Sequence, residues 1–335
     1  MISTFSTKIH PLAQQCRNHS YIVILLSLMY LLNSHNTTPD YYQHLLNVTD
    51  SKNPALEPYQ FSLKSLTQPG GPSFLVMKNL PIDQPLPEPP RNGKRPTHKN
   101  TWISEATLFS IQHMMGMQPL SYLQEKGGVL VHEIAPVPGL DKSLSNSGMV
   151  ALGFHTDDSI LKPEFRPEFL TLLGLINEEH TPTFIAPIDW AFAELSSRHQ
   201  QELMKPQYRV ESPESFKIFG GKVLRSELRS LVTRNPDGDL EIAGNLYAIT
   251  TREPQAKVAL DSLKAILPEI AESVVLEPGC AVIFSNSRVL HGRAAITGGK
   301  RWLQRCFSRK NLDSLRKATG NYDTYSFDIQ KLILK

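Results

Sequence analysis

The feature that most constrains the fold of this chain is a succession of short apolar runs, each about as long as a β-strand. These runs are Val129–Ile134, Gly148–Phe154, Phe169–Ile176, Cys280–Phe284 and Trp302–Ser308. Two helical patterns interrupt them, at Ser197–Met204 and Pro254–Leu267. Because strands and helices do not alternate, the pattern argues against a doubly wound parallel sheet. It predicts a mainly β fold with helical insertions (α+β), built as a β-sandwich or jelly roll.

The chain before these runs is expected to add one strand, one long loop and one helix. Phe74–Met77 is a short apolar run that suits a strand. Six prolines between Pro81 and Pro96 exclude a helix or a central strand in that stretch. Thr101–Met115 is expected to be a helix with Thr101 as its N-cap, and Asn235–Gly238 is a strong turn signal.

Composition narrows the class of protein. The 335 residues can form one large domain or two ordinary ones, and 40% hydrophobic with 20% charged residues is a globular composition. Thirty-five Lys and Arg against 32 Asp and Glu leave a charge of +3, too small to predict a nucleic-acid partner. Cys16, Cys280 and Cys306 share no close spacing, so neither a disulfide framework nor a cysteine zinc site is expected.

The N-terminus carries an apolar run at Tyr21–Leu32. Its twelve residues are fewer than the roughly 20 that a membrane span needs. Its shape also suits a signal peptide, but Leu32–His35 offers no small-residue cleavage site. We therefore expect an extension with an apolar helix over residues 1–40 and a single domain over residues 41–335. The protein is expected to be cytoplasmic with no stable membrane span, and export is the alternative.

His155 and Asp157 are the sharpest local signal. Side chains at alternate positions of an extended strand point to the same side, so these two residues are expected to share a face. A histidine beside a carboxylate can supply two ligands of a 2-His-1-carboxylate metal site. The same pair can also be an ordinary hydrogen-bonded pair at a strand end, and the motif alone does not decide between them.

A second polar segment follows the Cys280–Phe284 strand. It contains Asn286, Arg288 and His291–Arg293, which we expect to form a polar loop. The next strand alternates, with Arg305 on the same side as the apolar Leu303 and Phe307. A buried guanidinium needs an anion, either a protein carboxylate or a ligand. The alternative is an exposed strand face with incidental apolar residues.

Taken together, these segments resemble the iron(II)/2-oxoglutarate-dependent oxygenases. The resemblance rests on His155–Asp157, His291–Arg293 and the strand from Arg301 to Arg305, and it extends from about Gly71 to Asp313. It is closest to the clavaminate synthase-like group of the taurine dioxygenase superfamily, which includes amino-acid hydroxylases. The family's fold is a double-stranded β-helix, or jelly roll, as the strand pattern also predicts.

The resemblance also implies a site and a reaction. It implies that iron(II) is bound by His155, Asp157 and His291, and that 2-oxoglutarate is held by Arg305 and Thr183. O₂ is the other cosubstrate, and succinate and CO₂ are released. The substrate is expected to be small and amino-acid-like, and the residues implied for it are Arg309 for the α-carboxylate and Gln124, Glu125 and Asn146 for the amino end.

The chain departs from the clavaminate-like group at several positions. That group usually has glutamate where Asp157 stands, and Asp158 is an alternative ligand if the strand is distorted. Asn245 occupies a region where the amino-acid hydroxylases usually have an acidic residue. Three other functions stay open: desaturation or cyclisation of a natural-product intermediate, a binding protein that has lost turnover, and a zinc hydrolase. The last leaves Arg305 unexplained.

Overall fold

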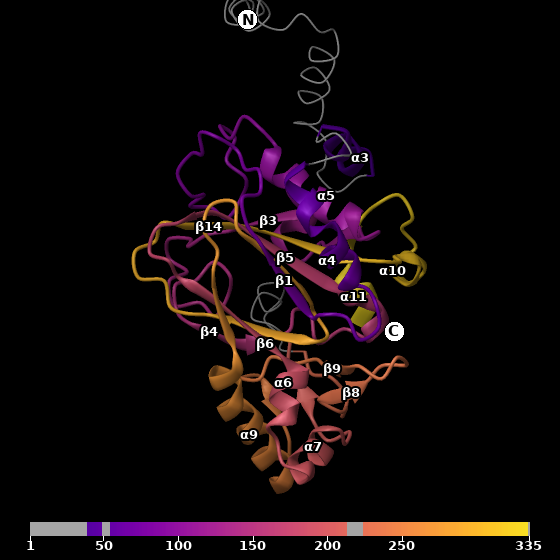
Figure 1. Ribbon diagram of the computed structural model, residues 1–335. Helices are drawn as coiled ribbons and strands as arrows, with labels where there is room; N and C mark the ends of the chain where they lie inside the picture. The colour runs from indigo at the N-terminus through magenta and orange to yellow at the C-terminus, as the bar shows by residue number, and fades with distance from the viewer. Residues whose placement is uncertain (1–38, 49–53, 213–223, 334–335) are drawn as a thin grey trace, which may run out of the picture.

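A computed structural model describes residues 39–48, 54–212 and 224–333 of the chain (Figure 1). The apolar run Tyr21–Leu32 lies outside these residues, so the expected extension over residues 1–40 and single domain over residues 41–335 stay predictions. None of the described helices combines the length and the apolar character that crossing a bilayer requires.

The larger of two facing sheets has seven strands. In spatial order its path is β1 (Phe74–Met77), β12 (Ala281–Ser285), β5 (Phe169–Asn177), β14 (Arg301–Arg309), β2 (Gln118–Tyr122) and β15 (Ser326–Phe327), with β3 (Val131–Ile134) paired to β14. All its pairs are antiparallel except β15 with β2. Strand β14 lies at the centre of this sheet, which is why its side chains are buried on both faces.

The smaller sheet has four strands in the order β11 (Glu272–Val275), β6 (Pro182–Pro187), β13 (Val289–Arg293) and β4 (Leu152–His155). Consecutive strands pass from the larger to the smaller sheet three times, from β3 to β4, from β5 to β6 and from β12 to β13. Two facing antiparallel sheets joined in this way form a jelly roll. The predicted fold class, a mainly β chain with helical insertions, is therefore confirmed.

Helices cover the outer faces of both sheets (Figure 1). On the side of the larger sheet lie α3 (Pro39–Val48), α4 (Gln60–Ser65), α5 (Ile103–Met114), α10 (Asp313–Thr319) and α11 (Ile329–Ile333). Beyond the smaller sheet lie α6 (Ile188–Ala193), α7 (Ser197–Leu203), α9 (Pro254–Ile270) and two short ribbons, β8 (Val232–Arg234) with β9 (Leu240–Ile242) and β7 (Arg209–Val210) with β10 (Ile249–Thr250). Short 3₁₀ turns are η1 (Pro54–Tyr59), η2 (Lys126–Gly128) and η3 (Pro163–Phe165).

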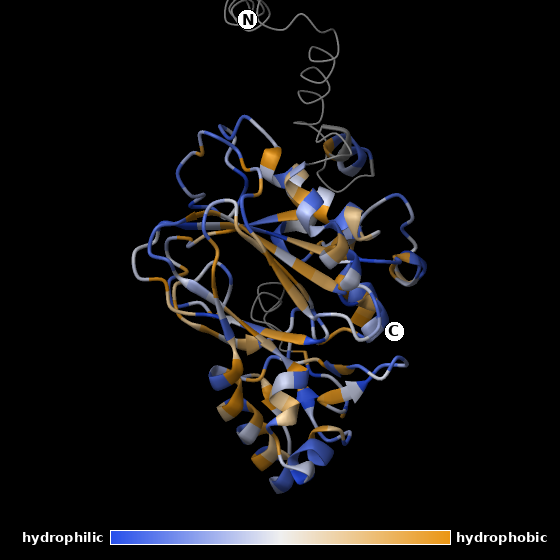
Figure 2. Cartoon of the chain, in the orientation of Figure 1, coloured by the Kyte–Doolittle hydropathy of each residue, from blue (hydrophilic) through white to orange (hydrophobic). Residues whose placement is uncertain are grey.

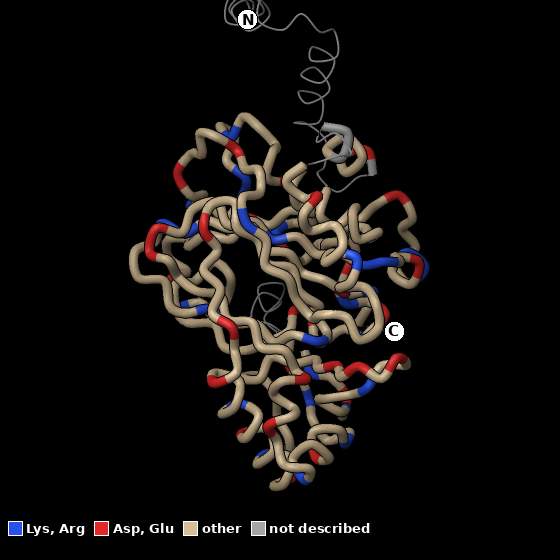
Figure 3. Tube along the Cα trace, viewed as in Figure 1, with Lys and Arg blue, Asp and Glu red and all other residues tan. Residues whose placement is uncertain are grey.

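Two apolar cores hold these layers together. One includes the larger sheet and the helices over it, and the other lies among α6, α7, α9 and the short ribbons. Figure 2 shows the same division, with apolar residues along the strands of the larger sheet and on the inner sides of the lower helices. Figure 3 shows Lys and Arg interspersed with Asp and Glu over the chain trace.

The predicted apolar runs match β1, β3, β5, β12 and β14 within one or two residues at each end, whereas β2 and β11 were not predicted and the polar segments differ. The segment from 286 to 293 was expected to be a polar loop, but Val289–Arg293 is a fully buried strand, β13. Similarly, β4 ends at His155, so Asp157 lies in the turn after the strand rather than within it. Hydropathy underestimates how deeply both segments are buried, because their polar side chains face the site that they form.

The start of α5 is capped by a residue distant in sequence. Thr101 was expected to cap this helix, but Asp83 accepts hydrogen bonds from the backbone N–H groups of Ile103 (3.1 Å) and Ser104 (3.0 Å). Lys99 lies 2.7 Å from the same carboxylate and neutralises its charge. The carboxylate thereby satisfies two of the unpaired N–H groups of the first turn.

Both faces of β14 are polar in part, and each polar residue has a defined environment. On the helix side, Trp302 Nε1 donates to Glu133 (2.6 Å), and Gln304 Nε2 donates to the other oxygen of Glu133 (3.1 Å). Burial and the nearby charge of Glu105 raise the pKa of Glu133 to about 7. On the jelly-roll side lie Arg301 and Arg305, both buried. The exposed-face alternative for this strand is therefore wrong.

Candidate active site

A pocket of about 960 Å³ opens between the two sheets. Its walls come from β4, β6, β13 and β14 and from the loops after β2 and β3. Several of the residues singled out in the sequence line it, among them Gln124, Glu125, Asn146, His155, Asp157 and Arg305. A volume of this size accommodates a cosubstrate together with a substrate of amino-acid size.

Three potential metal ligands converge beside this pocket. His155 on β4 and His291 on β13 are direct partners across an antiparallel pair, with ring centroids 4.2 Å apart. Asp157 Oδ1 lies 3.5 Å from His155 Nε2 and 3.9 Å from His291 Nε2. The ligand atoms of all three lie within 4.8 Å of one another, and no other such group occurs among the described residues. The sequence prediction thus named the three residues that the fold brings together.

The surrounding backbone fixes the orientation of these side chains. His155 Nδ1 lies 2.8 Å from the carbonyl oxygen of Gly153, so the hydrogen bond leaves Nε2 facing Asp157. Asn286 accepts from the N–H of Asp157 (2.9 Å) and donates to its carbonyl oxygen (3.0 Å). Asn286 therefore fixes the turn that carries Asp157, a role that the sequence pattern did not reveal.

The pKa values of Asp157 and His291 favour the protonation states that bind a cation. Although burial opposes its charged form, the charge of Arg305 and the hydrogen bond to His155 hold the pKa of Asp157 well below its usual range. Burial and the neighbouring His155 lower the pKa of His291 to about 3, so this ring is neutral. A carboxylate beside a neutral imidazole is the donor combination that divalent iron, zinc or a similar ion prefers.

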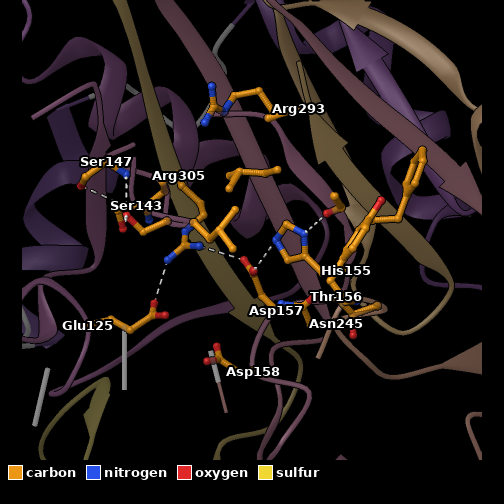
Figure 4. Close-up of a pocket in the computed structure, with 18 of the residues that line it drawn as sticks. Glu125, Ser143, Ser147, His155, Thr156, Asp157, Asp158, Asn245, Arg293 and Arg305 are labelled. Carbon is orange, nitrogen blue, oxygen red and sulfur yellow. Dashed lines mark hydrogen bonds and ion pairs between the residues drawn. The ribbon is translucent and has the colours of Figure 1, made fainter. Parts of the chain in front are cut away.

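Arg305 links the metal-ligand set to the rest of the pocket (Figure 4). Its Nη1 donates to Asp157 Oδ2 (2.8 Å), and its Nη2 donates to Glu125 (2.7 Å) and lies 2.7 Å from His132 Nδ1. Burial and the charge of Arg305 hold the pKa of His132 well below its usual value, so this ring can accept the hydrogen bond. Arg305 therefore has protein carboxylates as partners.

Arg301, four residues earlier on β14, has the opposite situation. It is 2% exposed, its Nη2 lies 3.4 Å from the Thr183 hydroxyl, and its Nε has no hydrogen-bond partner. Among the described residues, no carboxylate lies within ion-pair distance of it. Burial and the neighbouring Arg293 lower the pKa of Arg301 to about 9. A buried guanidinium without a counter-charge is a binding position for an anion.

The remaining predicted substrate residues are distributed unequally. Arg309 does not line the pocket, because its guanidinium is held by the carbonyl oxygens of Arg166 (2.9 Å) and Pro163 (3.2 Å) and lies 3.4 Å from Glu168. Gln124 lines the pocket, but its amide donates to Asp328 (2.6 Å) and accepts from the N–H of Ile329 (2.9 Å). Its polar atoms are thereby engaged in holding the C-terminal segment in place.

Asp158 and Asn245 complete the pocket wall. Asp158 has a φ of 52°, the left-handed region that closes the turn after Asp157, and its carboxyl group points to the pocket side (Figure 4). Burial, followed by the charges of Glu125 and Asp157, raises the pKa of Asp158 well above its usual value. Asn245, whose backbone pairs with His155, also lines the pocket, where its side chain accepts from the N–H of Tyr247 (3.2 Å). Asp158 does not take part in the converging ligand set.

Comparison with known proteins agrees with this geometry. The family model described as "Taurine catabolism dioxygenase TauD, TfdA family" matches residues 111–307, more than half of the chain. The chain belongs to the TauD, TfdA dioxygenase family. Among curated members, it is 31% identical to the L-asparagine oxygenase of Streptomyces coelicolor over 265 residues, which cover 75% of this chain and 76% of the relative. It is 24% identical to the enduracididine beta-hydroxylase of Streptomyces hygroscopicus, covering 79% and 82%.

Solved structures of two oxygenases share the fold. Asparagine oxygenase in complex with Fe(II), 3-hydroxyasparagine and succinate superposes with a TM-score of 0.72 at 23% identity, covering 93% of this chain and 98% of that one. The non-heme iron oxygenase OrfP, in complex with Fe, succinate and (3S)-hydroxy-L-Arg, gives a TM-score of 0.73 at 21% identity, covering 91% and 95%. The predicted family and the predicted jelly roll are both confirmed.

Proposed function

We propose that this dioxygenase uses iron(II) and 2-oxoglutarate to hydroxylate a free α-amino acid or a close derivative. The observation that carries the proposal is the pairing of two features on adjoining strands: a converging His–Asp–His set and a buried arginine, Arg301, that has no counter-charge and lies beside Thr183. The relatives support it. One is named L-asparagine oxygenase, and the similar structure of OrfP holds (3S)-hydroxy-L-Arg in one complex and Fe with alpha-ketoglutaric acid in another.

The residues present fit iron(II). Two imidazoles and one carboxylate converge from one side and leave the pocket side open, which is the facial arrangement of non-haem iron oxygenases. When bound, the iron activates O₂ and couples insertion of one oxygen atom into a C–H bond to conversion of 2-oxoglutarate into succinate and CO₂. A zinc hydrolase would have the same ligands but no use for the unpaired Arg301.

Arg305 acts on the ligand set from behind. It binds Asp157 through Oδ2, while Oδ1 faces the two imidazoles. The guanidinium therefore orients the carboxylate so that one oxygen stays directed toward the metal position. Such support from outside the ligand set typically contributes a 10- to 100-fold effect on metal affinity or activity.

For the cosubstrate, we assign the distal carboxylate of 2-oxoglutarate to Arg301 and Thr183. The resemblance gave this role to Arg305 by its distance from His291 along the chain, together with Thr183. The contacts favour Arg301, which lies beside the Thr183 hydroxyl and lacks an anion, whereas Arg305 already has two carboxylate partners. A guanidinium and a hydroxyl together offer a carboxylate up to three hydrogen bonds.

For the substrate, we assign the α-carboxylate to Arg305 rather than to Arg309, because Arg305 lines the pocket and Arg309 does not. The incoming carboxylate would replace Glu125 at Nη2, while Nη1 keeps its bond to Asp157. Glu125 is then free to accept the substrate's ammonium group. Asn146, on the loop that covers the pocket, is an additional polar contact for that end of the substrate.

Measurement of succinate across a panel of free L-amino acids, their N-acylated forms and short peptides tests the substrate class. We expect one or a few free amino acids to stimulate succinate release and to gain one oxygen atom by mass spectrometry. The reason is that Arg305 binds a free α-carboxylate and Glu125 binds a free α-ammonium group. A product that instead loses two hydrogens would identify desaturation. Stimulation only by compounds without a free carboxylate would contradict the assignment of Arg305.

We also propose that the protein works in the cytoplasm. Cys280 and Cys306 are buried and form no disulfide, which suits a reducing compartment. The third cysteine, Cys16, and the apolar run Tyr21–Leu32 lie outside the described residues.

A further inference from the structure

Asp158 is a buried carboxyl group for which the fold provides no partner. The residue is 4% exposed, its side chain makes no hydrogen bond to a described residue, and its Oδ2 is fully buried. It lines the same pocket as Glu125 and Arg305, and Figure 4 shows its carboxyl oxygens directed toward the space between Glu125 and Asp157. A buried carboxylate without a partner is costly, and in native proteins it usually has a structural or functional reason.

The hydrogen bonds that the polar groups near Asp158 make are directed to other residues. Arg305 donates to Asp157 and Glu125, and the Arg166 guanidinium donates through Nε to the carbonyl oxygen of Leu161 (2.6 Å). The nearby Tyr122 hydroxyl donates to the carbonyl oxygen of Phe165 (2.5 Å). None of these groups donates a hydrogen bond to the Asp158 side chain, so its carboxyl group is left to accept from a ligand in the pocket.

Substrate binding would increase the number of carboxyl groups in the pocket that lack a partner. Asp157, once it binds the metal, no longer counts as a free negative charge, and a substrate carboxylate on Arg305 uses the positive charge that now faces Glu125. Glu125 then loses its contact with Arg305, and both Glu125 and Asp158 face the pocket with oxygen atoms that can accept from a ligand. A primary ammonium group offers three donors, enough for both carboxylates and one further acceptor.

We propose that Asp158 is a substrate-binding carboxylate that receives, together with Glu125, the positively charged amino group of the substrate. The proposal rests on the proposed function and deepens it. It accounts for the neutral Asn245 in the same pocket, since Asp158 supplies the carboxyl group that Asn245 lacks. The substrate class that fits is a zwitterion whose ammonium group is free and unsubstituted.

Asp158→Asn tests the proposal with little change in shape. The full-length protein is loaded anaerobically with iron(II) and 2-oxoglutarate, and Kd is measured from the ligand-induced change of the visible absorption. The probes are L-asparagine and L-arginine, each compared with the analogue in which a hydroxyl group replaces the α-amino group. Asp141→Asn, which removes an exposed carboxylate, is the matched control.

We expect Asp158→Asn to form the iron–cosubstrate complex as the wild type does and to bind the preferred amino acid about 10-fold or more weakly, equal to about 1.4 kcal/mol. Binding of its hydroxy analogue should change little, because the lost interaction is with the ammonium group. Asp158→Ser should show the same contrast, and Asp141→Asn should match the wild type throughout. Melting temperatures of all variants check folding independently of ligand.

Three results would overturn the assignment of Asp158 alone. The first is equal weakening of the amino acid and its hydroxy analogue, the second is an unchanged Kd for both, and the third is loss of the iron–cosubstrate absorption in Asp158→Asn, which would place Asp158 among the metal ligands. A wild-type protein that prefers neither probe to its hydroxy analogue also contradicts an ammonium site. Absence of the absorption in the wild type would instead reject the iron and 2-oxoglutarate chemistry itself.

Discussion

Alanine at Asp157 should abolish 2-oxoglutarate turnover, with a loss of succinate formation of about 1,000-fold or more, equal to about 4 kcal/mol of activation free energy. The reason is that the Oδ1 of Asp157 faces both imidazoles, at 3.5 Å from His155 and 3.9 Å from His291. Alanine at either histidine should have a similar effect. The measurement is succinate yield at saturating iron(II), together with the iron content after desalting.

The fold should survive this change, because Arg305 keeps its ion pair with Glu125 at 2.7 Å. Asp158→Asn is the informative neighbour, since it removes an adjacent carboxylate that does not belong to the converging set. It should retain its iron, whereas Asp157→Ala should not. Full turnover in Asp157→Ala combined with loss of iron in Asp158→Asn would exchange the roles of the two residues.

Arg301→Lys should raise the KM for 2-oxoglutarate by about 100-fold, equal to about 2.7 kcal/mol. A lysine replaces the planar fork of donors by a single charged centre, so a paired hydrogen-bond contact to a carboxylate becomes one contact. Burial also lowers the pKa of Arg301 to about 9, and a lysine in the same surroundings would lose its charge more readily. Steady-state kinetics with 2-oxoglutarate as the varied ligand measures the effect.

Arg305→Lys is the matched comparison on the same strand face. It should change the KM for 2-oxoglutarate only a few-fold while raising the KM for the amino acid strongly, because its partners are Asp157 and Glu125 rather than Thr183. The opposite result, with Arg305→Lys impairing 2-oxoglutarate binding and Arg301→Lys leaving it unchanged, would restore the assignment made from chain spacing.

The sequence was sufficient to predict the strands whose apolar residues are continuous. Phe74–Met77 has the predicted bounds, and the central strand β14 extends the predicted Trp302–Ser308 by one residue at each end. It failed for β13, because Val289–Arg293 contains His291 and Arg293 and reads as polar. Those side chains are buried because they face the interior between the sheets, and a hydropathy scale assigns every polar residue to the surface.

The site was predictable in part for a related reason. His155, Asp157 and His291 are recognisable because their residue types and order resemble a family motif. Arg301 and Arg305 could not be told apart, since both lie on the inner face of one strand and only the partners of each reveal its role. Those partners, Thr183 for one and Glu125 with Asp157 for the other, come from distant parts of the chain.

The capping of α5 shows the same limit in the fold. Local pattern favoured Thr101 as the cap, whereas the capping carboxylate is Asp83, which lies 20 residues before the first N–H group that it binds. Thr101 instead donates its hydroxyl to Asp83 (2.6 Å). A cap supplied by tertiary structure leaves no signature at the spacing that sequence rules use.

The central claim is that this pocket binds iron(II) and 2-oxoglutarate together. Its most direct test is the visible absorption of the full-length protein when both are added without oxygen. We expect a weak charge-transfer band that requires both additions, that is lost in Asp157→Ala, and that needs far more 2-oxoglutarate in Arg301→Lys. A correctly folded wild-type protein that binds iron(II) but gives no band at any concentration of 2-oxoglutarate would contradict the account.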